Sequence, residues 1–314
     1  MDIKELTGFR DRIVNSCSKV IVGKEDVLFN VLVCFLCSGH ILLEDVPGTG
    51  KTMLLRSFAK TIGGSFKRVQ FTPDVLPSDL TGINFYNLKH GEFEFRPGPL
   101  FANMVLADEI NRATPRTQSS LLEAMAERQI TVDGVTHMMK DPFMIMATQN
   151  PLESHGTFPL PDAQTDRFFM RLSLGYMTRA EEISVLEGKD TLDIVNELEA
   201  VTTPEEIQQL KADCRNVEVS ADVAGYLMDL ITSTREDKRI RIGISTRGAI
   251  AIYRAAQAAA GLEGRDFVLP EDITRLASGV LAHRLTLSGI PEPGEDVRII
   301  EDIIKATPVP LEDR

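Results

Sequence analysis

The stretch Ile41-Leu42-Leu43-Glu44-Asp45-Val46-Pro47-Gly48-Thr49-Gly50-Lys51-Thr52 decides the fold of this chain. A short apolar run opens it, glycines follow, and an amphipathic pattern with Met53 and Phe58 begins directly after it. This order predicts a strand, a glycine loop and a helix. In such a loop the backbone N–H groups point at phosphate oxygens, and the helix N-terminus adds a partial positive charge. The stretch therefore predicts a site for the phosphates of a nucleotide.

Two side chains of the loop have expected roles in that site. Lys51 is expected to reach the β- and γ-phosphates, and the Thr52 hydroxyl is expected to hold Mg²⁺. The full phosphate-loop pattern has a glycine where this chain has Asp45, so the match is confined to Pro47–Thr52. A short glycine-lysine match can arise by chance, but one placed between a strand pattern and a helix pattern is specific.

Composition limits the class of protein. The chain has 314 residues, 43% of them apolar and 25% charged, which is ordinary for a globular protein of about two domains. The formal net charge is −12 and the sequence pI is about 5.0. An acidic surface argues against a protein whose main work is binding nucleic-acid phosphates, although it leaves room for a local basic groove.

The cysteines and the N-terminal segment indicate a cytoplasmic protein. Cys34 and Cys37 form a Cys-x-x-Cys inside an apolar run, and the chain has no second such pair, so we expect buried thiols and not a metal or redox site. The first 20 residues are polar and charged, which argues against a signal peptide. The apolar run 27–37 is too short to span a bilayer, so no membrane span is expected.

Apolar strand patterns alternate with helical patterns in the first half of the chain. Strands are expected at 41–43, 66–71, 104–108, 143–147 and 168–174. Such alternation favours an α/β fold with a parallel sheet covered by helices on both faces. Two β-hairpins are expected as insertions at 85–95 and 129–138. After Gly175 only helical patterns follow, so we expect a nucleotide-binding domain over 1–175 and a helical domain over 176–314.

The acidic pair Asp108-Glu109 is the second landmark, because it ends a buried strand. Alone, such a pair is more often the start of a solvated loop. Together with a phosphate loop it has a chemical meaning, since Mg²⁺ prefers oxygen ligands and ATP hydrolysis needs a base beside the γ-phosphate. We therefore expect Asp108 to hold Mg²⁺ with Thr52, and Glu109 to activate water.

Three further residues have two possible roles each. Asn150 follows the next apolar strand, where it either contacts the γ-phosphate or the attacking water, or forms a turn before a proline. Arg167 is either a surface arginine paired with a neighbouring aspartate or an arginine finger for another subunit. Arg247 begins a helix, where a cation is disfavoured by the helix dipole unless an anion lies there. The five histidines show no metal-ligand spacing, which argues against a metallohydrolase.

The following segments carry a resemblance to a known family: 42–52, 107–113, 118–125, 147–151, 159–164 and 166–168. Through them the chain resembles the AAA+ ATPases, and within these the MoxR family, over nearly its whole length. The resemblance implies an AAA+ P-loop NTPase fold with a five-stranded parallel sheet, helices on both faces, two β-hairpin insertions and a small all-α lid domain.

The resemblance also implies roles for single residues. It makes Asp108 and Glu109 the Walker B acids, Asn150 sensor 1, Arg167 the trans-acting arginine finger and Arg247 sensor 2 in the lid. Related members also carry the aspartate found here at position 45. The residues it assigns to nucleotide binding are Val22, Gly23, Asp45, Val46, Pro47, Gly48, Thr49, Gly50, Lys51, Thr52 and Met53.

The function that the resemblance implies is a ring-forming, hexameric ATPase that uses ATP and Mg²⁺. Such a protein acts as a chaperone that remodels or matures client protein complexes, with a separate von Willebrand factor A domain protein as partner. A nucleic-acid motor or loader is the first alternative, and the net charge and the acidic hairpin residues Glu92 and Glu94 argue against it. A nucleotide-gated scaffold with little turnover is the second, and the intact acidic pair argues against it.

Overall fold

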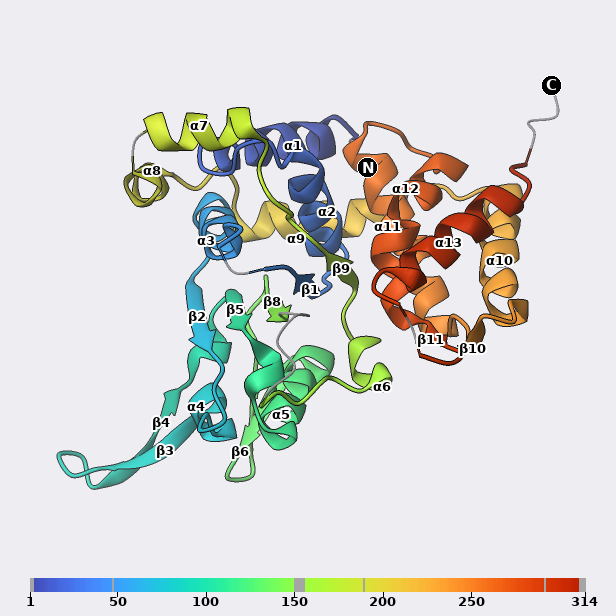
Figure 1. Cartoon of the computed structure of the whole chain (residues 1–314). Helices are drawn as coiled ribbons and strands as arrows, with labels where there is room; N and C mark the ends of the chain where they lie inside the picture. Colours follow the sequence, from blue (N-terminus) through green and yellow to red (C-terminus); the bar gives the residue numbers. More distant parts are fainter. Residues whose placement is uncertain (1–2, 47, 150–155, 189, 291, 311–314) are drawn as a thin grey trace.

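Five parallel strands form the central sheet, in the order β2-β5-β8-β1-β9 (Figure 1). The computed structural model describes residues 3–46, 48–149, 156–188, 190–290 and 292–310. The strands are β1 (Ile41–Glu44), β2 (Phe66–Gln70), β5 (Met104–Asp108), β8 (Met144–Gln149) and β9 (Met170–Leu172). The predicted five-stranded parallel sheet is thus confirmed, and the strand before the phosphate loop lies between two other strands.

Side chains of the strands alternate between two separate cores. Ile41 and Leu43 of β1 pack into the larger core, whereas Leu42 packs into the smaller one. Helices cover both faces, so the interior strands β1, β5 and β8 are mainly apolar and show no period-2 pattern. The helices of the first half are α1 (Ile3–Cys17), α2 (Glu25–Leu36), α3 (Lys51–Thr61), α4 (Pro77–Thr81), α5 (Pro115–Glu127) and α6 (Asp162–Thr165), with 3-10 turns η1 (Pro99–Phe101) and η2 (Ile110–Arg112).

Both predicted hairpins are present, and they contact each other. The first pairs β3 (Gly82–Asn87) with β4 (Glu92–Pro97), and the second pairs β6 (Gln129–Val132) with β7 (Val135–Met138). Asn84 donates a hydrogen bond to the Asp133 carboxylate at 2.9 Å. The rings of Phe95 and His137 stack with centroids 4.0 Å apart. The two insertions therefore form one unit, although 31 or more residues separate the strands along the chain.

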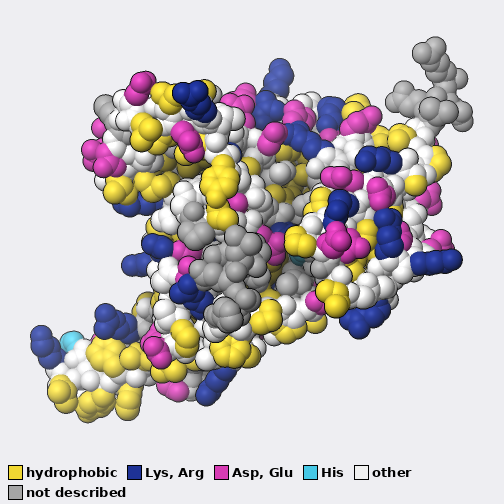
Figure 2. Space-filling view, viewed as in Figure 1, with side chains coloured by type: hydrophobic (Ala, Val, Ile, Leu, Met, Phe, Trp, Pro, Cys, Tyr) yellow, Lys and Arg dark blue, Asp and Glu magenta, His cyan; other side chains and the backbone are white. Residues whose placement is uncertain are grey.

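The first hairpin carries apolar side chains into solvent. Tyr86, Leu88 and Phe93 are 51%, 88% and 73% exposed. Figure 2 shows hydrophobic side chains gathered toward the end of the projecting hairpin. Monomeric proteins rarely expose large contiguous apolar patches.

The helices after β9 fall into two groups (Figure 1). The first group, α7 (Arg179–Glu187), α8 (Thr191–Glu197) and α9 (Pro204–Cys214), returns to the N-terminal helices, where α8 contacts α3 and α9 contacts α2. The second group forms the lid with α10 (Ala221–Glu236), α11 (Thr246–Leu262), α12 (Pro270–Leu281), η3 (Ala282–Arg284) and α13 (Glu295–Ala306). The division of the chain at residue 175 stays a prediction.

The lid also contains one small sheet, which the expectation of an all-α lid did not include. β10 (Ile240–Ile242) and β11 (Thr286–Leu287) pair antiparallel. Strands of two or three residues are too short to show a period in the sequence, and they form here because the tertiary fold brings them together. Among the described residues no helix is long and apolar enough to cross a membrane.

Candidate nucleotide-binding site

The phosphate loop and the acidic pair line one cavity of about 360 Å³. It opens where β1, β2, β5 and β8 end, at the edge where parallel sheets bind ligands. The residues lining it are Asp45, Gly48, Gly50, Lys51, Thr52, Met53, Arg68, Gln70, Asp108, Glu109 and Thr148. The structure thus brings together two sequence landmarks that are 57 positions apart.

The loop is built around two glycines and one lysine. Gly48 and Gly50 have φ angles of 87° and 88°, which only glycine adopts without strain. α3 begins at Lys51, so its first N–H groups face the cavity. The Lys51 ammonium donates hydrogen bonds to the carbonyl oxygens of Asp45 and Val46, at 3.1 and 3.2 Å. The lysine therefore spans the loop and presents a positive charge inside it.

Asp45 has a role that the sequence did not show. Its carboxylate is buried and accepts hydrogen bonds from Ser173 Oγ, Leu174 N and Gly175 N, at 2.9, 2.5 and 3.1 Å. This side chain anchors the segment that leaves β9 toward α7. The aspartate at the position of the first loop glycine is thus a structural link, and its role in nucleotide binding stays a prediction.

The acidic pair is held by a threonine on the neighbouring strand. Thr148, 1% exposed on β8, donates to Asp108 Oδ1 at 2.6 Å and accepts from the Glu109 N–H at 2.8 Å. The other carboxylate oxygen of Asp108 pairs with the Arg68 guanidinium at 2.5 Å. Both acids are therefore positioned by residues at the ends of adjacent strands.

Glu109 adopts a left-handed backbone conformation, with φ 57° and ψ 50°. A long side chain rarely takes this conformation, and such outliers gather at functional sites. The Glu109 carboxylate accepts a hydrogen bond from Gln70 Nε2 at 2.7 Å and pairs with Arg112 Nε at 3.1 Å. The turn thus directs Glu109 to the cavity, and Gln70 and Arg112 hold it there.

Sequence reasoning missed Arg68, Gln70 and Thr148. All three lie on β2 or β8, the strands that flank β5 in the sheet. A polar residue at the end of an apolar strand was the available signal, but only the strand order shows which strand ends meet.

The oxygen ligands in the cavity suit Mg²⁺. Thr52 and Asp108 line the same space and offer a hydroxyl and a carboxylate. Mg²⁺ is ordinarily held by one or two protein oxygens together with phosphates and water. No cluster of three or more His, Cys, Asp or Glu that could hold a metal is found in the described part of the chain. The chemistry therefore fits an ion shared with a triphosphate.

The other predicted residues that the structure describes do not line this cavity. Arg167 has an exposed side chain, and Arg247, 67% exposed, pairs with Asp166 at 3.5 Å. Arg247 does lie in the first turn of helix α11 as expected, two positions after the N-cap Ser245. Pro47 and Asn150 lie outside the described residues. The cavity lining also excludes four other predicted residues: Val22, Gly23, Val46 and Thr49.

Gly23 is packed against another element. It has a φ of 69°, and a Cβ added there would lie 1.7 Å from Glu181 Oε1 on α7. The adjacent Lys24 donates a hydrogen bond to the Tyr176 carbonyl at 2.8 Å. Any larger residue at position 23 would displace Glu181, so this segment is fitted closely to the chain that follows β9.

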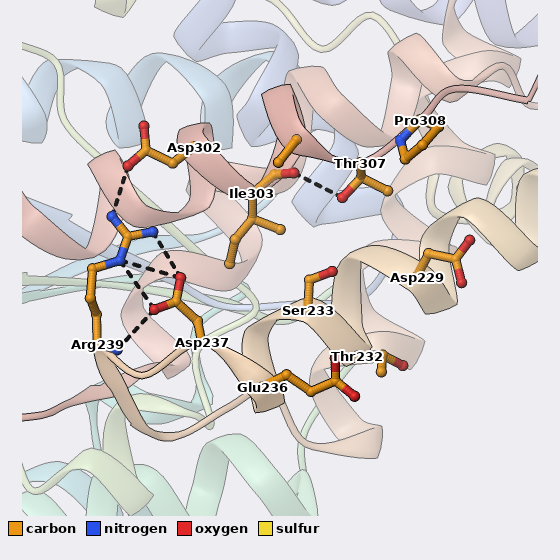
Figure 3. Close-up of a pocket in the computed structure, with 11 residues that line it drawn as sticks. Asp229, Thr232, Ser233, Glu236, Asp237, Arg239, Asp302, Ile303, Thr307 and Pro308 are labelled. Atoms are coloured by element: carbon orange, nitrogen blue, oxygen red, sulfur yellow. Dashed lines mark hydrogen bonds and ion pairs between the residues drawn. The ribbon is translucent and has the colours of Figure 1, made fainter.

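A larger cavity of about 600 Å³ lies in the lid, between α10 and α13 (Figure 3). Acidic side chains dominate it, and Arg239 is bound on two sides by Asp237 and Asp302, each at 2.8 Å. None of the predicted site residues lines it. It lacks a glycine loop and a helix N-terminus of the kind that binds phosphate, so we do not place the nucleotide there.

Replacing Thr148 with Val is expected to lower ATP turnover by roughly ten-fold and the free energy of unfolding by about 1–3 kcal/mol, because valine leaves the buried Glu109 N–H without an acceptor. Turnover and denaturant unfolding measure the two effects. The exposed Thr136, which hydrogen-bonds to Thr131, offers a matched control, and Thr136→Val should change stability by no more than about 0.5 kcal/mol. Full turnover in Thr148→Val would show that the threonine does not position Glu109.

A parallel sheet with a phosphate loop after one of its interior strands, two acids on a nearby strand and a helical lid define a P-loop ATPase. Comparison with known proteins agrees. Residues 40–170 match the model for the "ATPase family associated with various cellular activities (AAA)", and residues 232–305 match the AAA lid domain.

Two curated proteins and one solved structure are similar to most of this chain. The Bacillus subtilis protein YeaC is 46% identical over 99% of this chain and 97% of its own length. Chaperone MoxR1 of Mycobacterium tuberculosis is 36% identical over 88% of this chain and 76% of its own. The crystal structure of a Cytophaga hutchinsonii protein, named there as a candidate ATPase, has a TM-score of 0.89 and 36% identity over 98% of both chains. The chain belongs to the MoxR family of AAA+ ATPases.

Proposed function

We propose that this ATPase works as a chaperone in a ring of identical subunits, with six as the expected number. The observation that carries the proposal is the separation of the predicted catalytic residues. The phosphate loop and Glu109 share one cavity, whereas Arg167 is exposed outside it. Such a site supports full catalysis only when a neighbouring subunit contributes its arginine.

In the proposed reaction, water attacks the γ-phosphorus and the bond to the bridging oxygen of ADP breaks. Glu109 accepts the proton of the attacking water. Lys51 and the first N–H groups of α3 bind the phosphates, and Arg167 of the neighbour stabilises the charge on the transferring phosphoryl group. Thr52 and Asp108 would hold Mg²⁺, which neutralises phosphate charge when it is bound.

Two observations support the chaperone role: an exposed apolar surface on the first hairpin, and a relative that is named a chaperone. The hairpin residues Tyr86, Leu88 and Phe93 form an exposed apolar surface that suits contact with a protein client. One of the relatives above is named a chaperone. We propose a von Willebrand factor A domain protein as the separate partner, and a purified protein of this class should bind the ATPase in a pull-down.

Dependence on assembly tests the proposal directly. ATP turnover per subunit is expected to rise with protein concentration and then to level off, since subunits must meet before Arg167 reaches a neighbour's nucleotide. The measurement is a dilution series of the ATPase rate, with the mass of the assembly followed in parallel. A rate per subunit that stays constant down to concentrations where only monomer remains would contradict a shared site.

A further inference from the structure

Asp166, directly before Arg167, links that arginine to the lid. Its Oδ1 lies 3.0 Å from Arg284 Nε, and its Oδ2 lies 3.5 Å from Arg247 Nη1. Arg284 belongs to η3 and Arg247 to α11, so two separate elements of the lid converge on one carboxylate. The segment that presents Arg167 is thereby tied to both.

The contact with Arg284 is the shorter and more deeply buried of the two. Its side chain is 2% exposed, and it donates hydrogen bonds to the carbonyl oxygens of Phe168 and Phe169, at 2.7 and 3.2 Å, and to that of Val280. Burial lowers the pKa of Arg284 to about 10, which leaves it charged at neutral pH. A buried guanidinium requires a counter-charge, and Asp166 supplies it.

The lid also holds the two sides of the same turn. Before Arg167, Thr286 of β11 donates to the Asp162 carboxylate at 2.6 Å. After Arg167, the His283 ring nitrogen Nε2 lies 3.1 Å from the Phe168 carbonyl oxygen. The lid therefore contacts a side chain before Arg167 and the backbone after it, whereas the Arg167 side chain is exposed.

We propose that Asp166 is a positioning residue that makes the placement of Arg167 follow the lid. The inference deepens the proposed function and rests on it, because Arg167 acts there on a neighbour. Arg247 pairs with Asp166 in this structure, and its predicted alternative partner is a phosphate group. When Arg247 moves from Asp166 to a phosphate, the carboxylate retains only Arg284. The contact between Arg247 and Asp166 in one subunit would then control the position of Arg167 at the site of the neighbouring subunit.

Replacing Asp166 with Asn tests this, because asparagine keeps the size of the side chain and removes its charge. The affinity for a fluorescent ATP analogue should stay within about two-fold, whereas kcat should fall by on the order of 10²-fold, as expected for a misplaced catalytic group. Mixing Asp166→Asn subunits with Glu109→Gln subunits should restore turnover, because the Glu109→Gln subunits offer a correctly placed finger to sites with an intact base.

A matched control separates positioning from stability. Asp272 is 6% exposed and pairs with Arg265 inside the lid at 2.6 Å, so Asp272→Asn removes a comparable buried charge pair. It should lower the unfolding temperature and leave kcat of the folded protein unchanged. If Asp166→Asn does not fold, Asp166→Glu keeps the charge on Arg284 and displaces the carboxylate by one methylene, and the same measurements apply.

A parallel mixing experiment separates the positioning role of Asp166 from the trans action of Arg167. Arg167→Ala is mixed with Glu109→Gln in parallel. Recovery for Arg167→Ala without recovery for Asp166→Asn, or full kcat in Asp166→Asn, overturns the positioning role and leaves the proposed function standing. Equal loss of kcat in Asp272→Asn also overturns it. No recovery for Arg167→Ala shows that the finger does not act in trans, and the inference fails with it.

Discussion

Replacing Glu109 with Gln is expected to leave ATP binding intact and to lower turnover by about 10²–10⁴-fold, the range that a positioned general base contributes. Glutamine fits the space beside Gln70 and Arg112 but cannot take a proton from water. The phosphate loop and Lys51 are untouched, so the affinity should not change. Single-turnover hydrolysis and binding of a fluorescent ATP analogue measure the two quantities separately.

Glu127 provides the matched control for this substitution. It is an exposed glutamate at the end of α5, outside the cavity, and Glu127→Gln should turn over ATP at the rate of the unchanged protein. Undiminished turnover in Glu109→Gln would falsify the assignment of the base. A rise in KM with unchanged kcat would instead assign Glu109 to substrate binding.

Replacing Arg167 with Ala is expected to lower turnover by about 10³-fold or more, the effect of losing an arginine finger. Mixed with Glu109→Gln subunits, the variant should recover part of the activity, because each protein supplies what the other lacks. The site at such a boundary combines an intact Glu109 from one subunit with an intact Arg167 from its neighbour. The ATPase rate across a series of mixing ratios measures the recovery.

Arg298 is a matched control for the finger. It lies on α13, is 57% exposed and pairs with Glu292 at 3.1 Å, so Arg298→Ala removes an exposed arginine remote from the cavity lining. Its turnover should match that of the unchanged protein, with or without added Glu109→Gln subunits. If mixtures of Arg167→Ala and Glu109→Gln stay inactive at every ratio, Arg167 does not serve a neighbouring site.

The elements of the fold could be read from the chain because their signals are local. Three of the five sheet strands, β1, β5 and β8, are mainly runs of apolar residues. Caps such as Thr114 and Ser245 stand directly before the helices they begin. Sheet order had no such signal. β1 lies between β8 and β9, which are more than a hundred positions away along the chain, and neither periodicity nor the family resemblance predicted that order.

The sequence by itself determined the phosphate loop and the acidic pair. Both signals are local, because the loop glycines and the two carboxylates each follow directly on the strand pattern that identifies them. Only the tertiary structure decided what supports them. Thr148 lies 40 positions from Asp108, and Ser173 lies 128 from Asp45. Asp166 meets Arg284 across 118 positions in the same way. Hydrogen bonds and ion pairs act over about 3 Å, so these contacts depend on which strand ends and helices the fold brings together, and no spacing along the chain encodes that.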